Sequence, residues 1–118
     1  MDELVAEIAA FLRKNGWDHR VVFHIHDGPD VHYRNKRTLE ARRRQYLLTA
    51  NILRHHLPGV QLIEAVESTA FYGGVDIWVP ITCGFEHRRE EFARLIALGK
   101  SIWTYGSRNV RCRYSKNV

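Results

Sequence analysis

The sequence predicts an α/β fold, namely a partial (β/α) TIM-type barrel in which about four parallel strands and three helices form a half-barrel. Two observations favour it. Short runs of β-branched and aromatic residues mostly alternate with amphipathic segments, which is typical of parallel strands joined by helical crossovers. The chain has 118 residues, enough for one domain but too few for a complete eight-stranded barrel. We therefore expect a single half-barrel domain over 1–118, with a leading helix within 1–16 and a basic tail at 107–118.

The amino-terminal part of the chain predicts a helix followed by a strand. Apolar residues recur at helical spacing over 3–14, and Asn15-Gly16 is a stop signal. Residues 21–26 are all β-branched, aromatic or histidine, and Gly28-Pro29 then disfavours regular strand. The sequence therefore predicts the first strand at 21–26, running into a polar loop.

The rest of the chain continues the alternation. A long apolar stripe that ends at Pro58-Gly59 predicts the second helix. The connection between the second and third strands is short and has no clear helix, which is tight for a parallel pair. The predicted elements are a helix at about 38–57, a strand at 60–66, a strand at 75–80, a helix at about 86–98 and a strand at 101–105.

Composition and charge exclude several classes of protein. No apolar run approaches the roughly 20 residues that span a membrane, so no membrane partner is expected. The net charge of +5 comes largely from the arginines at 42–44 and from the tail, and no nucleic-acid-binding motif accompanies it. Cys83 and Cys112 lie in no ligand-like spacing, which predicts free thiols in a reducing cytoplasm. Nucleic acid is therefore not an expected partner, and the expected location is cytoplasmic.

Polar side chains gather at the carboxyl end of the first strand, which is where α/β proteins keep their chemistry. Side chains alternate along a strand, so His24 and His26 share one face, and Asp27 follows directly. The opposite face, with Phe23, is expected to meet the helices together with Ile77 of the third strand. With the histidines, on an inner face, we expect Asp76, Trp78, Trp103 and Tyr105, and Leu62 and Glu64 could belong to the same set.

This set of side chains suits a carbohydrate. A sugar ring stacks on aromatic faces and hydrogen-bonds through its hydroxyl groups, although the same residues would also suit other polar ligands. A carbohydrate or a small ester is therefore the expected ligand. The residues expected to bind it are His24, Asp76, Trp78 and Trp103.

Four motifs carry a resemblance to a known family. They are HIHDGP at 24–29, LPGVQLIEA at 57–65, GGVDIWVP at 73–80 and ALGKSIWTYG at 97–106. In this order and spacing they resemble the carboxyl-terminal half of a family 123-type glycoside hydrolase barrel and the related bacterial domain of unknown function 4091. The resemblance covers nearly the whole chain but only about half of the family's (β/α)₈ barrel.

The resemblance implies a substrate-assisted mechanism like that of N-acetylhexosaminidases, without a cofactor. In the family an Asp-Glu pair ends the first strand, where this chain has Asp27-Gly28. Asp27 matches the residue that holds and polarises the substrate's acetamido group. Gly28 stands where the family has the general acid, so a rate loss of roughly 10²–10⁴ is implied unless a neighbour substitutes. The candidate substitutes are His26, His32 and Tyr105. The resemblance therefore implies a degenerate or repurposed hydrolase.

Two other functions remain open. His24-x-His26 with Asp27 matches the His-x-His of metal-dependent hydrolases, in which Zn²⁺ or another divalent transition metal activates water to cleave an ester or phosphoester. His32 or Asp76 could complete such a metal site. The third possibility is a non-catalytic carbohydrate-binding module.

A half-barrel has two open strand edges and an uncovered inner face, which is a liability for a monomer. We therefore expect a homodimer that closes an eight-stranded barrel or packs two inner faces together. An amino-terminal helix folded over the inner face of a monomer would contradict this expectation.

Overall fold

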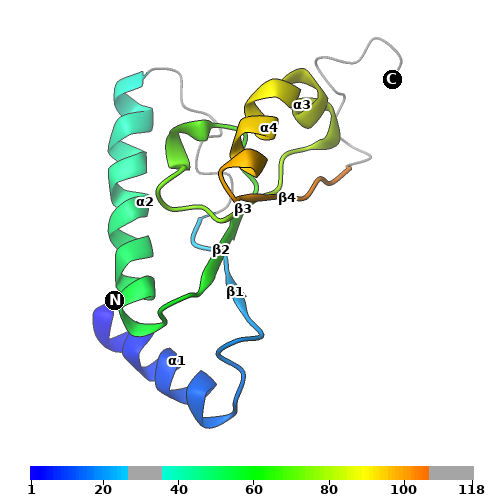
Figure 1. Ribbon diagram of the computed structural model, residues 1–118. Coiled ribbons are helices and arrows are strands. Elements are labelled where there is room, and N and C mark those ends of the chain that lie inside the picture. The colour runs from blue at the N-terminus through cyan, green and yellow to red at the C-terminus, as the bar shows by residue number, and fades with distance from the viewer. Residues whose placement is uncertain (27–35, 107–118) are drawn as a thin grey trace.

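The computed structural model describes residues 1–26 and 36–106, and in them four parallel strands form one sheet in the order β1-β2-β3-β4 (Figure 1). The predicted α/β class and parallel strand order are confirmed. The predicted tail at 107–118 lies outside the described residues. In chain order the elements are α1 (Asp2–Lys14), β1 (Val22–Phe23), α2 (Lys36–His56), β2 (Gln61–Glu64), the 3-10 helix η1 (Thr69–Phe71), β3 (Ile77–Trp78), α3 (Thr82–His87), α4 (Arg89–Ala97) and β4 (Ser101–Ile102).

The regular strands are shorter than predicted, although parallel hydrogen bonding continues past their ends. The backbone N–H of Val79 donates to the carbonyl of Glu64 at 2.8 Å, and that of Trp103 donates to Trp78 at 2.8 Å. The tight connection between β2 and β3 is made by η1. The helix predicted at about 86–98 corresponds to the end of α3 and to the whole of α4. The two helices are separate because the backbone of Arg88, which lies between them, is not helical.

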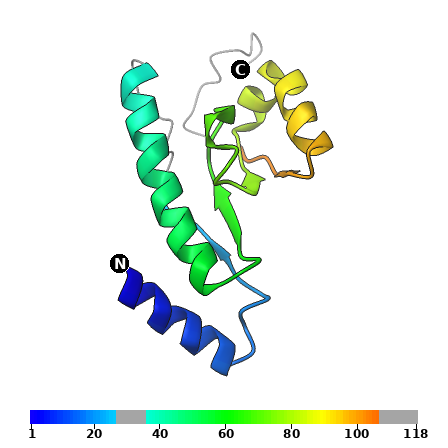
Figure 2. The ribbon, with the colours of Figure 1, turned by 60° about the vertical axis from the view of Figure 1, so that its left-hand side comes forward.

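All helices that supply the hydrophobic core cover one face of the sheet. Figure 2 shows α2 running alongside the strands, with α1 near its carboxyl-terminal end. Asp2 of α1 lies 2.8 Å from the imidazole of His56, and Arg13 donates to the His56 carbonyl. The hydrogen bond from His56 lowers the pKa of Asp2. The helical core residues are Val5, Ala9 and Leu12 of α1, Tyr46, Ala50 and Leu53 of α2, and Phe92 and Leu95 of α4.

The register assigns strand residues to the two faces. Phe23 pairs with Leu62, and Trp78 pairs with Glu64 and with Ile102. Paired residues of neighbouring strands and alternate residues of one strand share a face, so these five residues lie together on the helix-covered face.

The prediction that Trp78 faces away from Phe23 while Ile77 meets the helices is therefore wrong. Trp78 belongs to the hydrophobic core, and Ile77 points to the other face of the sheet. The reason is that parallel strands are apolar on both faces, so an alternating pattern does not show which face the helices cover.

The other face of the sheet carries apolar side chains that stand apart from this core. Val22, Ile63 and Ile77 lie on it by register; Val22 is 46% exposed, whereas Ile77 is only 3% exposed. Helix α1 packs against α2 and not over this face. The arrangement that would contradict a homodimer is therefore not seen, and dimerisation stays a prediction.

Two further expectations concern location. Among the described residues no helix is long and apolar enough to cross a bilayer. The prediction of a free thiol at Cys83 is wrong, because Cys83 is disulfide-bonded. The other cysteine, Cys112, lies outside the described residues. The expected cytoplasmic location loses the support that a free Cys83 thiol gave it.

Candidate functional site

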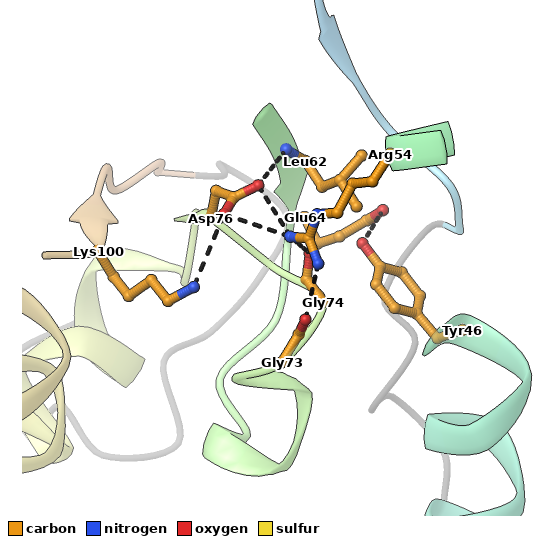
Figure 3. A network of polar contacts seen from close by, with 8 residues as sticks. All are labelled: Tyr46, Arg54, Leu62, Glu64, Gly73, Gly74, Asp76 and Lys100. Carbon is orange, nitrogen blue, oxygen red and sulfur yellow. Dashed lines mark hydrogen bonds and ion pairs between the residues drawn. The ribbon is translucent and has the colours of Figure 1, made fainter. Parts of the chain in front are cut away.

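A buried carboxylate lies at the carboxyl end of β2. Glu64 is the last residue of this strand and is 1% exposed. Its Oε1 accepts hydrogen bonds from the backbone N–H of Ile25 at 2.6 Å and of His26 at 3.3 Å. The same oxygen accepts a hydrogen bond from the hydroxyl of Tyr46 at 2.8 Å (Figure 3). A buried carboxylate needs such donors to offset its lost hydration. Glu64 therefore fixes the chain that leads out of β1, directly before Asp27.

The second oxygen of this carboxylate faces a histidine. Nδ1 of His24 lies 2.8 Å from Oε2 of Glu64 and 3.4 Å from the carbonyl oxygen of Ile63. The direction of the contact to Oε2 does not meet hydrogen-bond geometry, and within residues 1–26 and 36–106 this oxygen has no other partner. The imidazole itself is half exposed, so a buried acceptor and a solvent-accessible ring meet at this edge of the sheet.

Tyr46 of α2 completes the buried group. Burial and the neighbouring Glu64 carboxylate raise the pKa of the Tyr46 hydroxyl well above its usual range. Its ring packs edge-on against Phe71, with the ring centres 5.4 Å apart. The hydroxyl therefore stays protonated and serves as a fixed donor to Glu64.

A cavity of about 350 Å³ lies beside this group, between α1, β1 and α2. Its apolar wall comes chiefly from the two helices and from Phe23 and Ile25. His24, His26 and Arg42 contribute polar groups, and Nε2 of His26 lies 3.4 Å from the Arg42 guanidinium. The cavity lies between β1 and the two helices, and it includes His24, which the sequence predicts to bind the sugar, but none of Asp76, Trp78 and Trp103.

Asp76, a predicted substrate-binding residue, lies at the opposite end of the strands. It precedes β3 and accepts from the backbone N–H of Leu62 at 2.9 Å and from Arg54 at 3.2 Å (Figure 3). Lys100 lies 3.7 Å from its other oxygen. Arg54 also donates to the carbonyl of Gly73 at 2.8 Å. This cluster ties α2, the β2–β3 connection and the start of β4 together, which is a structural role at the amino ends of the strands.

The two predicted sugar-stacking tryptophans are in different surroundings. Trp78 has no exposed surface, and its indole N–H points to the carbonyl of Ser68 at 3.4 Å. Trp103 follows β4 and is 54% exposed, and Tyr105 nearby is also exposed. A fully buried ring offers no face to a ligand, so of the three aromatic residues predicted for the inner face Trp103 and Tyr105 are available for stacking.

Other predicted site residues lie outside the described residues, namely Asp27, Gly28 and His32. Within the described ranges no three His, Cys, Asp or Glu side chains are close enough together to hold a metal ion. The predicted set of His24, His26 and Asp27 includes one undescribed member, so the metal site stays a prediction.

Sequence reasoning gave Glu64 no role, although it placed it among residues that could share the inner face. The signal was a single acidic residue inside the otherwise apolar end of VQLIEAV. The main partner of Glu64 is Tyr46. Tyr46 belongs to the apolar stripe of the second helix, and that pattern predicts only a core residue. Comparisons with models of known protein families and with curated proteins find no match.

Proposed function

We propose that the protein is a degenerate relative of glycoside hydrolases that binds carbohydrate at the carboxyl edge of its sheet. The observation that carries the proposal is the buried Glu64 carboxylate, which fixes the backbone immediately before Asp27. A site residue must be held to within a fraction of an ångström, and such anchoring is what a functional loop needs. The motif resemblance around Asp27 supplies the ligand class.

The proposed chemistry follows from the Asp27-Gly28 pair. Asp27 orients and polarises the 2-acetamido group of an N-acetylhexosamine, and the acetamido oxygen attacks the anomeric carbon. Glycine at position 28 has no proton to give to the leaving oxygen. We therefore expect turnover only with leaving groups that need little protonation, and binding without turnover for ordinary oligosaccharides.

The exposed aromatic residues favour a ligand longer than one sugar. His24 follows β1 and Trp103 follows β4, which are the two edge strands of the sheet. Three strand spacings separate them, about 14 Å in a flat sheet and less in a curved one. A single sugar ring does not bridge that distance, so an oligosaccharide is the ligand expected to contact both residues.

Binding of N-acetylhexosamine oligomers, measured by calorimetry, tests this proposal. We expect Trp103→Ala and Asp27→Asn each to weaken binding about tenfold or more. The matched control is Trp17→Ala, because Trp17 is also exposed but lies before β1 at the other end of the strands. Equal affinities for all four proteins, or no binding by the wild type, would contradict the proposal.

Hydrolysis of a 4-nitrophenyl N-acetylhexosaminide separates an impaired enzyme from a binding module. We expect slow turnover that a chelator leaves intact and that Asp27→Asn abolishes. Gly28→Glu should add turnover of N-acetylhexosamine oligomers, because their leaving sugar oxygen needs the proton. Sugar binding without any turnover would favour the non-catalytic module. Unchanged activity in Gly28→Glu, with binding intact, would count against descent from the glycosidase.

One observation favours the metal-dependent hydrolase as a second candidate. Nδ1 of His24 faces the Glu64 carboxylate, and metal-binding histidines commonly direct their other ring nitrogen to a carboxylate in this way. In this function Nε2 of His24, together with His26 and Asp27, would bind Zn²⁺ or a similar ion. Ester or phosphoester hydrolysis that a chelator abolishes and Zn²⁺ or Mn²⁺ restores would support it over the first proposal.

We also propose that a second copy of the chain covers the inner face. β1 and β4 each have one neighbouring strand among the described residues, and the inner face carries exposed Val22. If β4 of one copy lies beside β1 of the other, the parallel order continues around eight strands. Such closure would also place His24 of one copy near Trp103 of the other.

A further inference from the structure

We propose that Glu64 is a positioning residue that fixes the His24 imidazole as its Nδ1–H tautomer. The Nε2 atom is then left as an acceptor for a sugar hydroxyl. The identity of this ligand rests on the proposed function, whereas the tautomer rests on the geometry around Nδ1 alone.

The surroundings of Nδ1 determine where the proton lies. Two oxygen atoms face it, Oε2 of Glu64 at 2.8 Å and the carbonyl oxygen of Ile63 at 3.4 Å. Both are acceptors, so an unprotonated Nδ1 would place a third lone pair against them. A protonated Nδ1 instead supplies the donor that buried Oε2 otherwise lacks, after a small rotation of the ring.

The carboxylate cannot turn away from this contact. Its Oε1 is held by the Ile25 N–H at 2.6 Å and by the Tyr46 hydroxyl at 2.8 Å, one from the chain after β1 and one from α2. Both groups donate to the same oxygen, which leaves Oε2 directed at His24. A histidine whose tautomer is set by a fixed carboxylate presents its other nitrogen in a defined state.

The other end of the ring is open. The His24 side chain is 51% exposed, at the edge of the sheet where Asp27 follows. A neutral Nε2 has a lone pair and no proton, so it accepts a hydrogen bond from a hydroxyl and does not donate one. The arrangement therefore predicts recognition of a ligand donor at this position, and a sugar hydroxyl is such a donor.

The substitution Glu64→Gln tests this role with little change in packing. The amide oxygen must take the place of Oε1, because Ile25 N–H is a donor and would oppose an NH₂ group. The NH₂ then faces Nδ1 of His24, which has to accept, so the proton moves to Nε2. The folded structure is kept while the tautomer is reversed.

Long-range ¹H–¹⁵N correlation spectra report the tautomer directly. We expect Nδ1–H for His24 in the wild type and Nε2–H in Glu64→Gln. His56 is an internal control, because its Nε2 lies 2.8 Å from Asp2 and should carry the proton in both proteins. The matched variant Asp2→Asn should alter the His56 signals and leave those of His24 unchanged.

Oligosaccharide affinity provides the second measurement. We expect Glu64→Gln to bind about tenfold more weakly than the wild type, and Asp2→Asn to bind equally well. An Nε2–H signal for His24 in the wild type, or an unchanged tautomer in Glu64→Gln, would overturn the positioning role. The expected tautomers without any sugar binding by the wild type would support the positioning role and overturn the proposed function instead.

Discussion

Tyr46 and Glu64 form a buried hydrogen-bonded pair on which the candidate site depends. Tyr46→Phe removes one donor to a carboxylate that has almost no exposed surface. We expect it to lower the free energy of unfolding by about 1–3 kcal/mol, the usual cost of leaving a buried acceptor short of a partner. Urea denaturation measures this, with Tyr72→Phe as a control because Tyr72 is exposed and should change little.

The same pair predicts a dependence on pH. Burial raises the pKa of Tyr46 in the folded protein, while the unfolded chain has the ordinary value of about 10. Above that pH the unfolded chain releases the Tyr46 proton while the folded protein keeps it. The contribution of Tyr46 to the free energy of unfolding is therefore lost as pH rises. The stability difference between the wild type and Tyr46→Phe should therefore narrow above about pH 10, and a constant difference would contradict this.

The two tryptophans of the predicted sugar site should respond differently to truncation. Trp78 is fully buried, so Trp78→Ala should cost about 3–5 kcal/mol of folding free energy. Trp103 is half exposed, so Trp103→Ala should leave the urea midpoint nearly unchanged while weakening sugar binding. A large loss of stability in Trp103→Ala would show that this ring packs in the protein and does not serve a ligand.

At the scale of elements, the connection between β2 and β3 packs closely against α2. A Cβ added at Gly74 would lie 2.8 Å from Cε1 of the Tyr46 ring, whereas one at Gly73 would meet only Leu47 at 3.6 Å. The short crossover therefore fits because glycine lets it approach the helix at one position.

We expect Gly74→Ala to destabilise the protein by about 1–3 kcal/mol, the usual cost of overpacking, because the Tyr46 ring must move. Gly73→Ala should be neutral or slightly stabilising, because alanine there meets no close contact and restricts the unfolded chain. Thermal melts of the two variants test the difference. Equal melting temperatures would mean that the crossover can shift away from α2.

The Asp76 cluster also acts at this scale. It joins the end of α2 to the starts of β2, β3 and β4 through Arg54, Leu62 and Lys100. The strand pattern predicts a substrate-facing Asp76, and the structure places it at the amino ends of the strands. Its contacts explain why an acidic residue is needed there without any ligand.

At the scale of the whole molecule, the described strands form one four-stranded parallel sheet, and the helices of the hydrophobic core cover one face of it. We expect light scattering or native mass spectrometry to give twice the mass of the chain. Among the described residues β1 and β4 each have one neighbouring strand, and Val22 is exposed on the face away from the helices, which favours association. Val22→Asp, on the face away from the helices, should shift the protein toward monomer. Leu48→Asp should not, because Leu48 is an exposed side chain of α2. A monomer at every concentration would contradict this prediction.

Local patterns in the sequence were sufficient for the class of fold, the parallel order and the spans of α1 and α2. Helical periodicity and strand composition depend on neighbouring residues, and the short-strand, long-helix alternation restricts the topology. The same local signals placed His24 at the carboxyl end of the first strand. In the structure this residue lies beside the buried Glu64 carboxylate.

Only the tertiary structure decided the faces of the strands and the partners of the buried groups. Parallel strands are apolar on both faces, so composition did not show that Trp78 faces the helices and that Ile77, which is also buried, lies on the other face. Glu64 contacts residues far away in the chain, at 24–26 and at Tyr46, and no local pattern encodes those contacts. A one-residue change of register would exchange the two faces of a strand, so register, which is a long-range property, selects the residues that form the site.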